Sequence, residues 1–264
     1  MSDLPMPNGW FALLSSPELP RGRARCVEAF SRRIEIVRSA SGAVEARDLA
    51  RDAQEPWPIH ETGGLIFVHY DRSGRAPPPP PKLDEYLTRR WTRVFTDESD
   101  YRGHPIDVVE NVSDAAHFVE IHGAKAPATL RFEPAGAEAR LEARFPLATP
   151  VPGFPARLDI EMIGPALMLM KTWLLFDAMV MTTTYPIRAG LTRYRISVRA
   201  KKPRWLPLLP LLAAWVVFAK SRADTMKERA IWDRRQYLAA PRLSSVDRFV
   251  MPLRAWYAQF LTSP

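Results

Sequence analysis

Cysteine is almost absent from this chain. Its 264 residues include a single cysteine, Cys26, so a disulfide framework cannot form and the thiol content fits a reducing compartment. Residues 1–10 do not combine a basic segment with an apolar run, as a secretory signal peptide does. We therefore expect a cytoplasmic protein.

Long uncharged hydrophobic runs are also missing. The most apolar stretch, Trp205–Ala219, has fifteen residues without a charge, and Pro207 and Pro210 interrupt it. A spanning helix needs about 20 apolar residues, which argues against a transmembrane segment. Basic residues flank the stretch, so two interpretations stay open. It is a core helix or a lid over an apolar cavity, or it makes a peripheral contact with the inner face of a membrane.

Sequence motifs for phosphate or nucleic-acid binding are absent as well. The formal net charge is +8, yet the aromatic residues are not interleaved with the basic ones, as stacking on bases would require. No glycine-rich phosphate loop occurs. We expect no nucleic-acid partner.

Alternating apolar and polar residues predict an α+β protein with two domains, which meet at the proline run Pro77–Pro81. Residues 1–81 are predicted to form a small β-domain and residues 82–264 a larger domain with one long antiparallel sheet. The predicted strands are Trp10–Leu14, Ala24–Phe30, Ile34–Arg38, Leu65–Tyr70, Trp91–Phe95, Leu130–Pro134, Ala139–Phe145, Arg157–Ile163, Leu167–Leu175, Ala178–Tyr185 and Thr192–Ala200. The predicted helices are Val108–His122, Ala214–Tyr237 and Val246–Leu261.

Two histidines five residues apart, His117 and His122, follow Asn111 and Asp114 in one segment. In a helix Asp114 and His117 share a face, whereas His122 reaches the same point only if the helix ends or bulges. Gly123, which directly follows, is a common residue at helix ends. Two imidazoles and a distant carboxylate make up the metal-binding triad of non-haem Fe(II) enzymes. Two unrelated surface histidines are the alternative for this spacing alone.

The complete pattern Asn-x2-Asp-x2-His-x4-His resembles the mononuclear-iron motif of Rieske non-haem iron oxygenases. Residues 6–13, 18–22 and 57–68 resemble the beginning and end of the Rieske domain of that family. Ile231-Trp232, Pro241-x-Leu243, Asp247 and residues 254–260 resemble its ketosteroid hydroxylase and sterol 7-desaturase branch. The resemblance implies a Rieske-like β-domain followed by a helix-grip catalytic domain that binds one Fe(II) ion.

One departure from that family concerns its [2Fe–2S] cluster, which two cysteines and two histidines hold. Cys26 lies upstream of the segment where the family carries the cluster loops, and Glu45–Pro56 contains neither Cys nor His. His60 and His69 cannot replace thiolates. We expect a reduced Rieske-like domain without a cluster in residues 1–81.

The resemblance also implies a third iron ligand shortly before Ile231-Trp232, where this chain has Glu228. Asp224 shares the helix face of Glu228 at i,i+4 and is the alternative ligand, whereas Asp233 points elsewhere.

Two further residues of the motif are predicted to support the iron ligands. Asp114 is expected to orient His117 as a neighbouring carboxylate. Asn111 is expected to be a polar neighbour of the metal.

Three functions remain open for this chain. The first is an Fe(II)-dependent oxygenase-like enzyme for a bulky hydrophobic substrate, steroid- or polyketide-like, with Met162, Met168, Met170, Met179 and Met181 near the cavity. Its electrons would come from an external donor or from a cluster-bearing partner subunit, and the chain is expected to form a homotrimer or a mixed trimer. The second is a non-redox isomerase, cyclase or dehydratase. The third is a metal-free lipid-binding pseudoenzyme.

Overall fold

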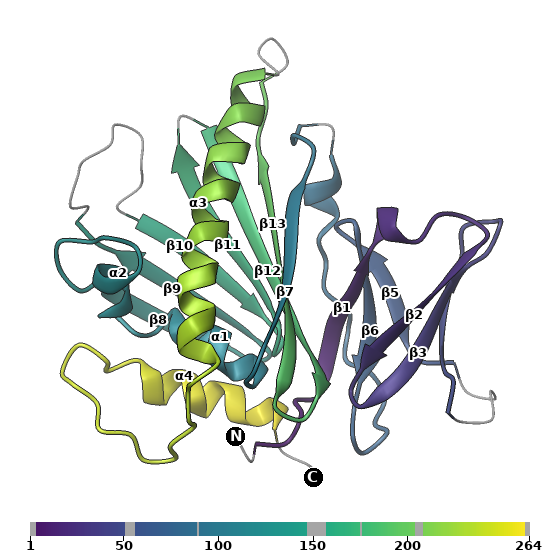
Figure 1. The fold of residues 1–264 in the computed structure, drawn as a ribbon, viewed down its shortest axis with the longest axis horizontal. Helices are drawn as coiled ribbons and strands as arrows, with labels where there is room; N and C mark the ends of the chain where they lie inside the picture. The colour runs from purple at the N-terminus through teal and green to yellow at the C-terminus, as the bar shows by residue number, and fades with distance from the viewer. Residues whose placement is uncertain are drawn as a thin grey trace.

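The computed structural model describes residues 4–50, 56–88, 90–146, 157–174, 176–203 and 208–261. These residues form an α+β fold of mostly antiparallel sheet, as predicted (Figure 1). The N-terminal strands are β1 (Gly9–Ser15), β2 (Arg23–Ala29), β3 (Arg32–Arg38), β4 (Val44–Asp48), β5 (Ile59–Thr62) and β6 (Leu65–Tyr70). The later strands are β7 (Phe95–Tyr101), β8 (Thr129–Ala135), β9 (Glu138–Arg144), β10 (Arg157–Ile163), β11 (Leu167–Leu174), β12 (Phe176–Arg188) and β13 (Leu191–Ala200). The α-helices are α1 (Pro105–Asn111), α2 (His117–Glu120), α3 (Leu208–Trp232) and α4 (Val250–Tyr257), and short 3-10 helices span Ser16–Glu18, Asp84–Leu87 and Ala258–Phe260.

The N-terminal strands form two small antiparallel sheets with the orders β2-β3-β4 and β1-β6-β5. Alternate residues such as Ile34 and Ile36 are fully buried between them, which is the period-two pattern of half-buried strands. The guanidinium of Arg38 on β3 donates two hydrogen bonds of 2.8 and 2.7 Å to the carboxylate of Glu61 on β5. This pair joins the two sheets.

The same sheets pack against the end of the larger sheet. Tyr185 and Ile187 of β12 share one hydrophobic cluster with the N-terminal strands. The backbone amide of Phe30 donates to the carbonyl of Pro186 at 2.8 Å. The division at residue 81 stays a prediction, although the proline run does separate the small sheets from β7.

The larger sheet has seven strands in the order β7-β13-β12-β11-β10-β9-β8, and every neighbouring pair is antiparallel. This confirms the predicted long antiparallel sheet. Helix α3 lies across one face of the sheet (Figure 1). On β12, Val180 and Thr182 face the helix, whereas Met179 and Met181 point to the opposite face and pack beneath β1 and β6.

The boundaries of α3 differ from the predicted Ala214–Tyr237. The helix begins at Leu208 because Pro210 falls in its first turn, where the missing N–H needs no partner. It ends at Trp232, whose ring is buried against Tyr101 and Tyr194. Trp205–Pro207 lie outside the described residues. No helix among the described residues is long and apolar enough to cross a membrane.

The single helix predicted for Val108–His122 is wrong. Helix α1 ends at Asn111, and α2 is one turn from His117 to Glu120. Polar side chains break the helix between them because they compete for backbone partners. The hydroxyl of Ser113 donates to the carbonyl of Glu110 at 2.7 Å, and the carboxylate of Asp114 accepts from the amides of Ala116 and His117.

The carboxylate of Glu110, at the end of α1, is 2% exposed and binds two arginines. Arg254 of α4 donates hydrogen bonds of 2.6 and 2.9 Å to it, and Arg235, just after α3, forms an ion pair with the same carboxylate. Three elements thereby meet at one buried charge.

Removal of this carboxylate should therefore destabilise the protein strongly. Glu110→Ala leaves two arginines without their partner and should lower the free energy of unfolding by about 3–5 kcal/mol. Denaturant unfolding followed by circular dichroism measures the change. The control Glu120→Ala removes an exposed carboxylate and should change the free energy by less than about 0.5 kcal/mol. Equal effects of the two substitutions would contradict the role of Glu110.

His104 caps α1 as a buried, neutral imidazole. Its Nδ1 accepts from the amide of Ile106 at 3.1 Å, so Nε2 carries the proton and donates to the carbonyl of Pro5 at 3.1 Å. Burial lowers the pKa of His104 to about 4.

The cap makes stability depend on pH. Between pH 6.5 and 4 the unfolded chain binds a proton that folded His104 does not, so the free energy of unfolding falls as the pH falls. By pH 5 this loss should reach about 2 kcal/mol. Between pH 7 and pH 5, denaturant unfolding should show a change in the free energy of unfolding that is about 2 kcal/mol more unfavourable in the wild type than in His104→Asn, which still accepts a hydrogen bond at the cap position. Parallel pH profiles of the two proteins would refute this assignment.

Candidate metal centre

His117 is the first residue of α2, and only one of its two ring nitrogens, Nδ1, contacts the backbone of the preceding turn. Its Nδ1 lies 2.5 Å from the carbonyl oxygen of Asp114. Since a carbonyl only accepts, Nδ1 carries the proton and the lone pair of Nε2 points away from α2. The imidazole is 6% exposed.

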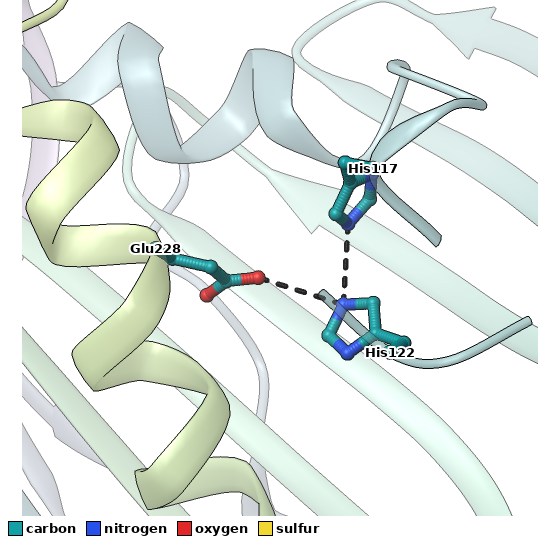
Figure 2. A group of neighbouring side chains, drawn as sticks. All are labelled: His117, His122 and Glu228. Carbon is teal, nitrogen blue, oxygen red and sulfur yellow. Dashed lines mark hydrogen bonds and ion pairs between the residues drawn. The ribbon is translucent and has the colours of Figure 1, made fainter. Parts of the chain in front are cut away.

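His122 lies beyond the end of α2, in the chain reversal at Gly123, whose φ of +73° is left-handed. Its Nδ1 contacts the carboxylate of Asp224 on α3 at 2.9 Å. The ammonium of Lys220 donates to the same carboxylate at 2.5 Å. This leaves Nε2 of His122 directed at Nε2 of His117, at 3.2 Å (Figure 2).

Glu228 comes from α3, more than a hundred residues later in the chain. Its Oε1 lies 3.5 Å from Nε2 of His122, and Figure 2 shows the carboxylate pointing towards both imidazoles. The amide of Asn111, on α1, donates to the same oxygen at 3.1 Å. One ligand atom from each of His117, His122 and Glu228 lies within 4.8 Å of the others.

These three residues fit a divalent transition-metal ion. Two imidazole nitrogens that bind such an ion at right angles, with bonds of about 2.1 Å, lie about 3 Å apart, close to the 3.2 Å between the two Nε2 atoms. Two lone pairs that face each other at this distance repel unless a cation lies between them. Two histidines with one carboxylate is also the ligand set that non-haem Fe(II) prefers.

The protonation of the two histidines differs. Burial lowers the pKa of His117, and the positive charge of His122 lowers it further. Burial opposes charge on His122 as well, but its hydrogen bonds to Asp224 and Glu228 outweigh burial and raise its pKa to about 9. The surroundings therefore favour one positive charge between the two rings.

The structure thus brings together His117, His122, Glu228 and Asn111, and it separates the alternative ligands. Asp224 contacts the far nitrogen of His122. Asp233 accepts from the backbone amide of Arg102 at 2.6 Å.

Asp114 differs from its predicted role. Its backbone carbonyl, rather than its carboxylate, contacts His117 Nδ1, because the side chain caps the first turn of α2.

An apolar cavity of about 170 Å³ lies beside these residues, between α3 and the sheet. A cavity of about 150 Å³ with apolar walls admits benzene, so an organic molecule fits here. Its apolar walls are Val108, Val112, Phe118, Phe145, Leu158, Ile160, Met168, Met170, Val180, Tyr194, Ile196, Val217 and Trp232. Of the five methionines predicted near a cavity, Met168 and Met170 line it. Met162 packs in the adjoining core, and Met179 and Met181 lie on the other face of the sheet.

Several wall residues were not anticipated from the sequence. Tyr194 and Trp232 are buried aromatic residues at this wall. The alternation along β12 and β13 indicates which residues share a face, but only the position of α3 decides which face encloses the cavity.

Solved structures share this fold. The chain resembles dicamba monooxygenase bound to dicamba with a TM-score of 0.73 and 15% identity, covering 97% of this chain and 98% of that one. It resembles Pseudomonas putida CBB5 NdmA with caffeine with a TM-score of 0.74 and 12% identity, covering 95% of this chain and 90% of that one. The fold is therefore that of the Rieske oxygenases.

Residues 68–261 match the family model described as 3-ketosteroid 9alpha-hydroxylase C-terminal domain. The chain belongs to this family, which confirms the resemblance seen in the sequence.

Two curated relatives show how much of the chain is shared. A probable 3-ketosteroid-9-alpha-monooxygenase, oxygenase component, of Rhodococcus rhodochrous is 27% identical, and the match covers 77% of this chain and 56% of the relative. Cholesterol 7-desaturase nvd 1 of Ciona intestinalis is 23% identical over 347 residues, covering 98% of this chain and 70% of the relative. The chain thus spans little more than half of the Rhodococcus protein. The Ciona alignment is longer than this chain, so that relative contains additional residues within it.

The metal site leads to a direct binding test. His117→Ala should abolish stoichiometric binding of Fe(II) in anaerobic titration calorimetry, because it removes one of three ligands. Asp224→Asn should weaken binding by about 10–100-fold, because it disturbs the orientation of a ligand histidine. His60→Ala, in β5, is the control and should bind as the wild type does.

The same titration tests the third ligand. Glu228→Ala should also lose binding. If it binds Fe(II) like the wild type, Asp224 or water occupies that position instead.

Proposed function

We propose that this chain is an oxygenase-like, non-haem Fe(II)-dependent oxidoreductase that acts on a bulky hydrophobic substrate and carries no Rieske cluster of its own. The observation that carries this proposal is the convergence of His117, His122 and Glu228 at the wall of an apolar cavity. Family membership supports it, and the names of the curated relatives describe oxygenase components and desaturases of steroids and sterols.

Each residue around the site has a defined task. His117, His122 and Glu228 would hold the iron, which when bound supplies activation of dioxygen beside the substrate. Asn111 holds the Glu228 carboxylate, and Asp224 accepts from Nδ1 of His122, so that Nε2 would be the nitrogen that binds the metal. The apolar walls exclude water and orient the substrate by shape.

The cysteine content supports the absence of a cluster. A Rieske [2Fe–2S] centre needs two thiolates, and this chain has only Cys26, which is exposed on β2. His60 packs near the ring of Trp10, and so does His69, which is also buried. The extra residues of the Ciona relative agree with a chain that has lost a segment.

Without a cluster, electrons must come from elsewhere. Insertion of one oxygen atom of O2 into a C–H bond, with reduction of the other atom to water, consumes two electrons and two protons. A separate reductase, serving a homotrimer of this chain, or a cluster-bearing partner subunit in a mixed trimer would supply them, and we place this assembly in the cytoplasm. The substrate is proposed to be a steroid or a polyketide of similar bulk, because the cavity walls are apolar and the relatives are named for steroids and sterols; the cavity of about 170 Å³ would enclose one part of such a molecule.

The lack of an electron carrier in the sequence also favours a second candidate. A non-redox isomerase, cyclase or dehydratase on this scaffold would use the metal or the His122–Asp224 pair for acid–base chemistry. A metal-free lipid-binding pseudoenzyme is the third candidate. The three differ in their need for iron and oxidant.

Cluster content and chemistry can be tested on the purified protein. Reconstituted with Fe(II), it should contain about one iron per chain and no acid-labile sulfide. With a panel of 3-ketosteroids and sterols, it should form a hydroxylated or desaturated product when hydrogen peroxide supplies the oxidising equivalents. His117→Ala should reduce product formation at least about hundredfold, as expected when a metal ligand is removed.

Each alternative has its own signature in this assay. Stoichiometric sulfide would refute the claim that the cluster is absent. Conversion without oxidant would support the non-redox enzyme. Steroid binding without iron uptake or turnover would support the pseudoenzyme.

A further inference from the structure

The first half of α3 has two different faces. Ala213, Ala214 and Val217 are buried against the sheet. The opposite face is apolar and exposed to solvent. We call it the apolar stripe, and it comprises Leu208 (75% exposed), Leu209 (49%), Leu212 (56%), Trp215 (52%) and Val216 (38%).

The spacing of the apolar stripe is that of a binding face. Its members stand at positions i, i+1, i+4, i+7 and i+8, so they form one continuous band along the helix. No charged residue occurs between Leu208 and Ala219. A contiguous apolar surface of this kind marks a site of contact with another molecule or with lipid.

Basic residues lie at the end of the sheet from which the chain enters α3. The amide of Lys202 donates to the carbonyl of Arg90 at 2.6 Å, and the amide of Thr92 donates to the carbonyl of Ala200 at 2.9 Å. These bonds bring Arg90 and Arg93 beside Lys201 and Lys202, and we call these four residues the basic edge. In Figure 1, β7, β13 and the start of α3 meet at the top of the molecule.

One ion pair with a carboxylate involves the basic edge among the described side chains. Lys201 lies 3.4 Å from the carboxylate of Asp177, and Arg93 stacks over the ring of Phe95. Among the side chains that the structure describes, Arg90, Arg93 and Lys202 form no ion pair with a carboxylate, and Glu85 lines a pocket together with Arg90 and Lys201. An anionic surface would therefore gain attraction at this end of the molecule.

We propose that the apolar stripe and the basic edge together bind the surface of an anionic lipid bilayer. Leucine and tryptophan on one side of a helix, with cations beside them, match the chemistry of helices that lie among lipid headgroups. A second copy of the chain would instead have to offer a surface that is both apolar and acidic.

The surface lies next to the cavity opening. Leu158, Thr172, Lys220 and Ser221 line the cavity and are partly exposed, so the cavity opens between α3 and the ends of β10 and β11. Val217, one residue beyond the apolar stripe, also lines it. A hydrophobic molecule dissolved in the bilayer would reach the cavity without crossing water. Bilayer binding itself requires neither iron nor turnover, so it is separable from the proposed function.

Vesicle flotation tests this proposal on the whole chain. The wild type should float with vesicles of phosphatidylcholine mixed with phosphatidylglycerol, and less with phosphatidylcholine alone. Raising the salt from about 0.1 M to about 1 M shortens the Debye length from about 10 Å to about 3 Å and should weaken the binding. Leu212→Asp should lower partitioning by about tenfold or more, because it places a charge in the headgroup–acyl boundary.

Matched variants control for indirect effects. Met226→Asp changes a residue of equal exposure (52%) on the same helix, three turns from Trp215, and should bind as the wild type does. Arg93→Glu and Lys202→Glu should each weaken binding at least about fivefold, whereas Arg23→Glu, on β2, should not. If Leu212→Asp lowers the melting temperature, Leu208→Ser replaces it, because Leu208 is 75% exposed.

The outcomes separate the occupants of this surface. Wild-type protein that fails to float with anionic vesicles overturns the proposal. So does equal binding by Leu212→Asp or Leu208→Ser. If Leu212→Asp instead converts an oligomer into monomers on size-exclusion chromatography with light scattering, and vesicle binding is unchanged, the stripe is a subunit interface and the proposal fails.

Discussion

The buried carboxylate of Glu110 constrains the part of this protein that follows β7. A charge that is almost fully removed from water must be paired, and its two arginines come from the segment after α3 and from α4. The end of α1 is therefore held against both segments. Asn111 is the next residue, and the segment that contains His117 and His122 starts there. The position of the two histidines proposed as metal ligands relative to Glu228 thus depends on an ion pair outside the cavity.

Each proposed ligand is held by a different kind of partner. A backbone carbonyl binds His117, a carboxylate binds His122 and a side-chain amide binds Glu228. Because the carbonyl and the carboxylate both accept from Nδ1, both imidazoles direct Nε2 at the same point, where a bound metal would take the place of the proton of His122. Lys220 in turn balances the charge of Asp224. These partners fix the orientation of the three side chains and the protonation of the imidazole nitrogens.

The sequence was informative where one physical signal dominated. Period-two alternation located most strands of the large sheet. The residues that converge came instead from the family resemblance, through its histidine motif and the Ile231-Trp232 pair. The break after Asn111 escaped prediction because Val108, Val112, Ala115 and Phe118 continue a helical apolar spacing through it. Strands β4 and β5 are too short to give a clear pattern. The sequence could not tell which methionines face the cavity. Alternation shows which residues share a face of the sheet, but only the packing of α3 shows which face encloses the cavity.

The ligands and the cavity walls come from different parts of the chain. All three proposed ligands lie on α2, the turn after it and α3, whereas much of the wall comes from β10, β11, β12 and β13. Substitutions such as those at Met168, Met170 or Val180 would reshape the cavity without moving a ligand. Mutations can therefore change the choice of molecules that enter the cavity while the proposed metal ligands, and with them the chemistry, stay the same. Chains with this architecture can thus differ in substrate while they keep the same residues at the proposed metal site.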